Sequence, residues 1–146
     1  VVSLLWQLAS EFRPGGPFSS VLDLGAGDGR FGQHPHHYTS YTGVETDAAK
    51  VAGAHLPRGS KLVVGDALDW PHNDYQLAIG NPPYIRHHGL DPAWRDAALT
   101  KIVKAGGPSL KKTANAFIIF LAQALLKTHD KGLVVQLIPY EWVTRP

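Results

Sequence analysis

The clearest chemical signal in this sequence is the tetrapeptide at positions 81–84, where Asn81 is followed by Pro82, Pro83 and Tyr84. Two consecutive prolines fix φ and remove two backbone donors, so they predict a rigid, non-helical corner. The corner would hold an amide side chain, an unpaired Pro82 carbonyl and an aromatic ring together, as a small polar pocket with a stacking face. By itself the tetrapeptide is equally typical of a plain turn, which these residue types favour.

A second group of candidate residues lies in a glycine-rich segment. Gly25, Ala26 and Gly27 follow an apolar run at 20–24 that predicts a buried strand and contains Asp23. Glycines after a strand let the backbone approach a ligand closely and let the next helix pack tightly on the sheet. Because the segment joins a predicted strand to a short predicted helix, it indicates a cofactor-binding turn.

Two acidic residues end further predicted strands. Glu45 lies about 20 residues after Gly25, the spacing at which an acid binds ribose hydroxyls in dinucleotide-binding folds. A carboxylate suits this position because it can accept hydrogen bonds from both hydroxyls of one ribose. Asp66, next to Ala67, can accept from an exocyclic amine such as that of adenine, although a cap on the following turn explains it nearly as well.

The elements that must position these residues follow from hydrophobic periodicity and from the Gly and Pro breakers. Strands are predicted at 20–24, 41–45, 61–65, 76–80 and 133–138, and helices at 1–12, 47–54, 91–104 and 115–127. This alternation predicts an α/β, Rossmann-like, doubly wound and mostly parallel sheet. Ligands bind such sheets beyond the carboxyl ends of the strands, so all the candidate residues are expected along one edge.

Composition limits the alternatives. With 146 residues the chain is one domain in length, and without cysteine it offers neither disulfides nor a thiolate metal site. His34, His36 and His37 surround Pro35 in a predicted loop without matching ligands, so no metal site is predicted. No apolar run is long enough to cross a bilayer, so no membrane association is expected. The sequence contains no methionine, even at position 1, and we expect it to be a piece of a longer protein.

Charge is segregated along the chain. Residues 21–80 carry more acidic than basic side chains, whereas residues 86–112 carry an excess of Lys and Arg. A basic stretch directly after the Asn-Pro-Pro corner suits a polyanionic partner near that corner. An ordinary solvated helix surface explains the charges equally well.

Taken together, the segments 21–29, 43–45, 64–67 and 79–85 resemble the S-adenosylmethionine-dependent DNA adenine-N6 methyltransferases. Their order is that of the gamma group, in which the cofactor motifs precede the catalytic motif. Residues 1–9 resemble the end of the helix before the glycine segment, and residues 138–142 resemble the motif after the fifth strand. The resemblance covers nearly the whole chain.

The resemblance implies a class I methyltransferase fold with S-adenosylmethionine as cofactor. Asp23 and the backbone of Gly25, Ala26 and Gly27 would lie at the methionine part, and Glu45 would hold the ribose.

Asp66 and the Ala67 amide would read the adenine of the cofactor, with Leu68 or Pro83 flanking its ring. Asn81 and the Pro82 carbonyl would each accept one N6 hydrogen of a flipped target adenine, and Tyr84 would stack on that base.

In this family the fold continues with two more strands and a target-recognition domain. Residues 1–146 are therefore expected to form an incomplete methyltransferase domain, truncated after the fifth strand and weakly active or inactive alone. An incomplete sheet would leave an exposed strand edge, which favours self-association or a missing partner. The expected partners are double-stranded DNA and a recognition domain or subunit, within a restriction–modification enzyme of a prokaryotic cytoplasm.

Other functions remain open from the sequence. Enzymes that methylate glutamine in release factors share the Asn-Pro-Pro-Tyr motif, and a close variant occurs in RNA guanine methyltransferases. A non-catalytic DNA-binding or regulatory subunit would not need the Asn81 amide. A dinucleotide-binding dehydrogenase would have its third glycine one position later in the sequence. This function also does not explain the Asn-Pro-Pro-Tyr tetrapeptide.

Overall fold

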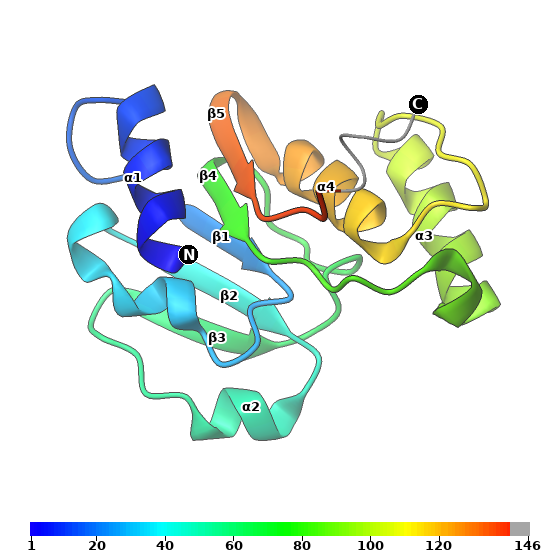
Figure 1. Ribbon diagram of the computed structural model, residues 1–146, viewed down its shortest axis with the longest axis horizontal. Coiled ribbons are helices and arrows are strands. Elements are labelled where there is room, and N and C mark those ends of the chain that lie inside the picture. The colour runs from blue at the N-terminus through cyan, green and yellow to red at the C-terminus, as the bar shows by residue number, and fades with distance from the viewer. Residues whose placement is uncertain (141–146) are drawn as a thin grey trace.

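A computed structural model describes residues 1–140, which form a single five-stranded parallel sheet with helices on both faces (Figure 1). The strand order is β3-β2-β1-β4-β5. Their bounds are β1 Val21–Leu24, β2 Tyr41–Glu45, β3 Ser60–Val64, β4 Tyr75–Gly80 and β5 Thr128–Gln136. The predicted α/β, doubly wound sheet is confirmed, and it is parallel throughout.

The predicted helices are also present. They are α1 Val2–Phe12, α2 Ala48–Gly53, α3 Pro92–Lys104 and α4 Ala116–Lys127. Short polar side chains begin two of them: Asp47 accepts from the N–H groups of Ala49 and Lys50, and Asp91 accepts from that of Trp94. These caps satisfy donors that the first turn of a helix leaves without partners.

Two connections differ from the prediction. The short helix expected after the glycine segment is a pair of 3-10 turns, η1 Arg30–Gln33 and η2 Pro35–His37, because Pro35 cannot donate to a continuing helix. Strand β5 begins directly after α4, since Thr128 already pairs with Tyr75. The ladder then shifts register before Leu133 pairs with Leu77, so only its second half matches the predicted strand at 133–138. A third short 3-10 turn, η3 His87–Gly89, follows the Asn-Pro-Pro corner.

The core divides between the two faces of the sheet because successive strand residues point to opposite sides. Val21 belongs to the cluster under α1, which contains the fully buried Trp6. Leu22 belongs to the cluster on the other face, against which Phe120 of α4 packs. Helix α3 then packs on α4 through Ile102.

The strand order reverses at β1. From β1 the chain builds outward to β2 and β3 on one side, and then returns to place β4 and β5 on the other. The segments that leave the carboxyl ends of β1 and β4 therefore diverge, which opens a crevice at this edge of the sheet.

Residues 141–146 lie outside the described part of the chain. Of the segment at 138–142, only Ile138, Pro139 and Tyr140 are described, and they follow β5 without regular structure. Within residues 1–140, no helix combines the length and the apolar character that crossing a membrane requires.

Gly43 at the centre of β2 provides a test of the packing. A Cβ there would overlap Leu62 Cδ2 and lie 2.8 Å from Ala26 Cβ. We expect Gly43→Ala to lower the free energy of unfolding by about 1–3 kcal/mol, measured by urea denaturation, because a close-packed sheet must shift to admit it. Gly53→Ala is the matched control, since nothing lies within 4 Å of that Cβ. Equal stability of the two variants would contradict this packing.

Candidate functional site

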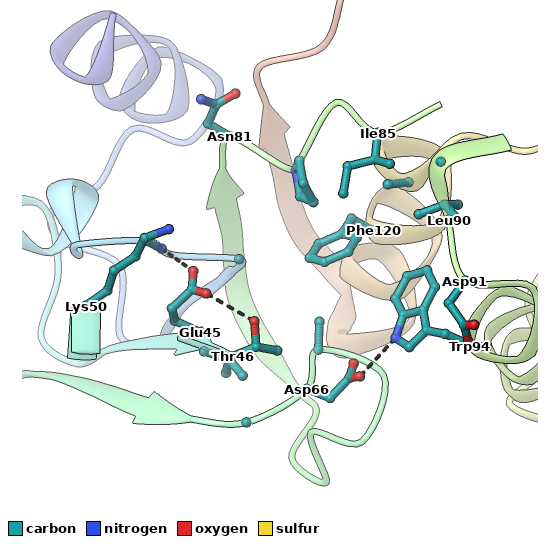
Figure 2. A pocket seen from close by; sticks show the side chains of 18 residues that line it. Glu45, Thr46, Lys50, Asp66, Asn81, Ile85, Leu90, Asp91, Trp94 and Phe120 are labelled. Carbon is teal, nitrogen blue, oxygen red and sulfur yellow. Dashed lines mark hydrogen bonds between the residues drawn. The ribbon is translucent and has the colours of Figure 1, made fainter. Parts of the chain in front are cut away.

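A cavity of about 470 Å³ lies at the carboxyl ends of the strands (Figure 2). Its walls come from the glycine segment, from the ends of β2, β3 and β4, and from α3 and α4. The cavity is of the size that holds a small-molecule cofactor. Seven residues predicted from the sequence line it: Gly25, Gly27, Glu45, Asp66, Ala67, Asn81 and Pro83.

A second cavity, of about 610 Å³, lies on the other side of the glycine segment. It includes the predicted residues Asp23 and Ala26. The two cavities share Gly25, Gly27, Lys50 and Asn81, so the glycine segment and these two side chains lie between them.

Glu45 ties the end of β2 to the glycine segment. Its Oε2 accepts from the Gly27 N–H at 2.8 Å, and its Oε1 accepts from the Asp47 N–H at 3.0 Å and from Thr46 Oγ1 at 3.2 Å. Burial alone would raise the pKa of Glu45, but the two N–H groups and the charge of Lys50 outweigh it and hold the pKa below its ordinary value. The carboxylate is therefore ionised, and it keeps room to accept from a further hydroxyl.

Asp66 is held from two sides. Its Oδ1 accepts from the Leu68 N–H at 2.8 Å, which is the turn cap expected from the sequence. Its Oδ2 accepts from the indole Nε1–H of Trp94 at 2.9 Å, and Figure 2 shows the indole and the carboxylate side by side in the cavity wall. Each oxygen can accept a second hydrogen bond, so the carboxylate is fixed in orientation and still able to take a ligand amine.

Asn81 sits at the tip of β4, with its side chain exposed. The Tyr84 hydroxyl oxygen lies 2.7 Å from Asn81 Oδ1 and 2.9 Å from the Leu137 carbonyl, and its single proton can go to either. Pro82 is fully buried, whereas Tyr84 is 49 % exposed. Pro82 and Tyr84 line neither of the two cavities. The Tyr84 hydroxyl lies against the amide oxygen of Asn81.

The segment after the corner is fastened to the start of α4. The Ala116 N–H donates to the Ile85 carbonyl at 2.9 Å, and Asn115 Oδ1 accepts from the His87 N–H at 2.9 Å. These bonds join two segments about 30 residues apart in the sequence, and they fix the direction in which the chain leaves Asn81.

Asp23 is a buried carboxyl at the reversal point of the sheet. It is 1 % exposed, its Oδ2 accepts from the Tyr41 hydroxyl at 2.7 Å, and its Oδ1 is buried without a hydrogen-bond partner. Burial raises the pKa of Asp23 to about 7; the Tyr41 hydrogen bond opposes this rise and the charge of Glu45 adds to it. Asp23 thus lines the second cavity, but its unpaired oxygen is itself buried and faces Gly80 of β4.

The apolar walls differ in part from the expectation. Pro83 and Phe120 line the first cavity, and a Cβ on Gly25, whose φ is +75°, would lie 3.1 Å from the Phe120 ring. Leu68, named with Pro83 as a flank for the adenine ring, is instead buried in the cluster between α3 and α4. Phe120 and Trp94 also line this cavity, and neither was predicted from the sequence.

These observations fit S-adenosylmethionine, the cofactor expected from the sequence: a cavity of suitable volume, glycines whose backbone a ligand can approach closely, and the ionised carboxylate of Glu45. The fold is that of the class I S-adenosylmethionine-dependent methyltransferases. More narrowly, the chain belongs to the Eco57I restriction-modification methylase family, which matches residues 57–146. No curated protein sequence matches the chain significantly.

Solved structures share the fold at low sequence identity. A type I restriction-modification system methyltransferase subunit from Streptococcus thermophilus matches with a TM-score of 0.75 and 19 % identity, over 100 % of this chain and 34 % of that one. A putative RNA methyltransferase from Pyrococcus horikoshii matches with a TM-score of 0.63 and 19 % identity, over 98 % and 62 %. A TehB-like SAM-dependent methyltransferase from Corynebacterium glutamicum matches with a TM-score of 0.55 and 17 % identity, over 90 % and 60 %. The chain thus spans between a third and two thirds of these proteins.

The pKa of Asp23 predicts a pH-dependent stability. Because it is raised from 3.8 to about 7, the folded protein holds this proton more tightly than the unfolded chain does. The resulting stabilisation is complete below the unfolded pKa and is lost as the pH rises towards 7. We expect the free energy of unfolding, measured in urea, to fall across this window in the wild type and to fall less in Asp23→Asn. Asp130→Asn, at an exposed position, is the control, and identical pH profiles for all three proteins would contradict the assignment.

Proposed function

We propose that this chain carries the catalytic part of a restriction–modification methyltransferase that transfers a methyl group from S-adenosylmethionine to adenine N6 in DNA, in a prokaryotic cytoplasm. The observation that carries the proposal is the position of Asn81. Asn81 directly follows β4, beside the reversal point of the sheet, and it lines both cavities. There one planar amide can face a group bound on either side of the glycine segment.

The first cavity suits the nucleoside part of the cofactor. Glu45 would accept from a ribose hydroxyl while keeping its bond to the Gly27 N–H, and Asp66 with the Ala67 amide would meet the edge of the adenine. Pro83 and Phe120 provide apolar surfaces for the ring. Asp23, at the second cavity, would face the charged methionine end.

The Asn-Pro-Pro corner would bind and orient the amino group of the target base. Adenine N6 is a poor nucleophile because its lone pair is delocalised into the ring. Hydrogen bonds from its two N–H groups to Asn81 Oδ1 and to the Pro82 carbonyl would localise that lone pair and orient it. Because Pro82 is buried, this step requires the corner to open enough to expose its carbonyl. S-adenosylmethionine, when bound, supplies an activated methyl group on a positively charged sulfur.

The Tyr84 hydroxyl lies within hydrogen-bond distance of Asn81 Oδ1 and of the Leu137 carbonyl. A target base that takes the place of this hydroxyl at the amide oxygen would displace the Tyr84 ring. The displaced ring would be free to stack on the base, an interaction worth about 1–3 kcal/mol.

DNA as the substrate is supported by the charge after the corner. Arg86, Lys104 and Lys111 are exposed and form no ion pair within residues 1–140, so they can contact phosphates. Lys101 and Lys112, in contrast, pair with Asp69 and Asp96. The family name supports a restriction–modification context, with a recognition domain or subunit as the partner. Because one structural relative is described as an RNA methyltransferase, RNA is the main alternative substrate.

The proposal predicts that Asn81→Ala lowers the rate of methyl transfer by at least about a hundredfold, because the acceptor that orients N6 is lost. The natural full-length protein is incubated with labelled cofactor and unmethylated duplex DNA, RNA or a release factor, and the labelled base or residue is identified. Binding of the cofactor should remain within about threefold, since the nucleoside contacts are retained.

Asn73→Ala, in the exposed loop before β4, is the matched control and should transfer normally. Label found only in RNA or only in protein would show that this molecule, and not DNA, is the substrate. Cofactor binding without transfer to any substrate would favour a regulatory subunit.

The Trp94–Asp66 hydrogen bond predicts a role for the indole in cofactor affinity. Trp94→Phe keeps an aromatic wall but frees Asp66 Oδ2, so the carboxylate loses its fixed orientation. We expect S-adenosylhomocysteine to bind about three- to tenfold more weakly by calorimetry, which corresponds to roughly 1 kcal/mol.

Trp70→Phe is the matched control, because it also removes an indole N–H···O bond, to the Tyr75 hydroxyl, outside the cavity. Tighter binding by Trp94→Phe would show instead that the indole competes with the ligand for Asp66.

A further inference from the structure

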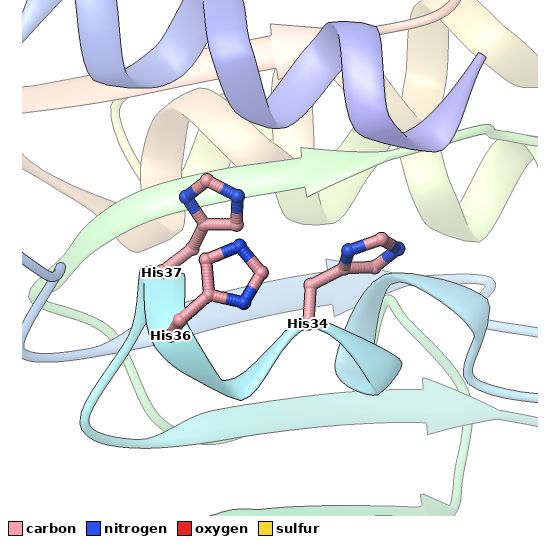
Figure 3. Close-up of side chains that lie close together, drawn as sticks. All are labelled: His34, His36 and His37. Carbon is pink, nitrogen blue, oxygen red and sulfur yellow. The ribbon is translucent and has the colours of Figure 1, made fainter.

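A cluster of three imidazoles lies at the other end of the sheet from the two cavities. His34, His36 and His37 stand on and next to η2, shortly before β2 begins, whereas the cavities lie at the carboxyl ends of the strands. Figure 3 shows the three side chains on the same side of this turn, facing α1. Each offers a ring nitrogen, and these nitrogens all lie within 4.8 Å of one another.

The backbone brings the rings together. Neighbouring residues usually direct their side chains apart, but the turn around Pro35 places the His36 and His37 ring centres 4.0 Å apart. The His34 ring lies 6.1 Å from that of His36 and 6.3 Å from that of His37. The Pro35 ring restricts this arrangement further, because it fixes φ in the middle of the cluster.

His37 is held by α1. Its ring stacks on Trp6 with centres 4.9 Å apart and an angle of 1° between the planes. Its Nδ1 lies 3.4 Å from Ser10 Oγ. Trp6 is fully buried and its indole N–H donates to the Phe31 carbonyl, so the surface on which the imidazole rests is rigid.

Few protein groups compete with a ligand for the ring nitrogens of the cluster. Within residues 1–140, the ring nitrogens of His34 and His36 make no hydrogen bond or ion pair.

From this geometry we propose that His34, His36 and His37 form a binding site for a zinc-type divalent transition metal ion, which would fasten the turn between β1 and β2. Zinc is bound by imidazole nitrogens at about 2.0–2.1 Å, so tetrahedral ligands lie about 3.4 Å apart. Side-chain rotations that move each nitrogen by about an ångström would bring the three together. Three protein ligands leave a fourth position to water. Imidazole donors favour Zn, Ni and Cu over Mg or Ca.

The test uses the untagged protein with Co²⁺ as a spectroscopic probe and Zn²⁺ in competition. We expect one Co²⁺ per chain, the visible absorption of a tetrahedral site, and its loss on addition of one equivalent of Zn²⁺. His36→Ala should weaken Zn²⁺ binding by at least about tenfold in calorimetry. His72→Ala is the matched control, because His72 also lies against a tryptophan, Trp70, but outside this cluster.

Because the three histidines are close in sequence, the unfolded chain can also bind metal. The titration is therefore repeated in concentrated urea, where affinity should fall by at least about tenfold if the fold arranges the rings. Equal affinity in the folded and unfolded chain, equal affinity of His36→Ala and wild type, or an octahedral Co²⁺ spectrum would each overturn the proposal.

Discussion

The constraint on which the rest of this structure depends is the parallel sheet that reverses its order at β1. Parallel strands need crossover connections, so all five strands end at one edge, and the segments that follow them meet there. Reversal at β1 makes the segments after β1 and β4 diverge, and the cavities form between them. Asp23 of β1 lies at this reversal point and packs against β4. Its buried Oδ1 is so close to Gly80 that a Cβ on this glycine would collide with it.

A second feature is that the polar groups of the site are oriented by the protein itself. Glu45 is held by N–H groups of the glycine segment and of the turn after β2, and Asp66 is held by a backbone N–H and by Trp94. Carboxylates fixed in this way lose little conformational freedom when a ligand binds. Asn81 differs, because its Oδ1 lies beside the hydroxyl of Tyr84, whose proton can also go to the Leu137 carbonyl. The two carboxylates are thus preorganised, whereas the Asn81 amide has the exposed side chain of Tyr84 as its neighbour.

The two ends of the sheet are suited to different chemistry. The carboxyl end combines acids, an amide and an adjoining basic surface, whereas the opposite end brings three imidazoles against α1. Helix α1 connects these ends: Val1 and Val2 border the second cavity, and Trp6 and Ser10 contact His37. A metal ion at the histidines would therefore stiffen the helix whose first residues adjoin the proposed methyl-transfer site.

The sequence by itself determined the fold class and which of the predicted residues gather at the carboxyl edge of the sheet. Hydrophobic periodicity located the strands, and residues such as Glu45, Asp66 and Asn81 had to share one edge because each directly ends or follows a parallel strand. Tertiary structure alone decided what comes from distant segments: the indole of Trp94 on Asp66, Phe120 against Gly25, and the burial that raises the pKa of Asp23. It also decided the convergence of the three histidines, which depends on local dihedral angles and on Trp6. Sequence patterns report the period and the ends of elements, whereas contacts between side chains depend on how the elements pack.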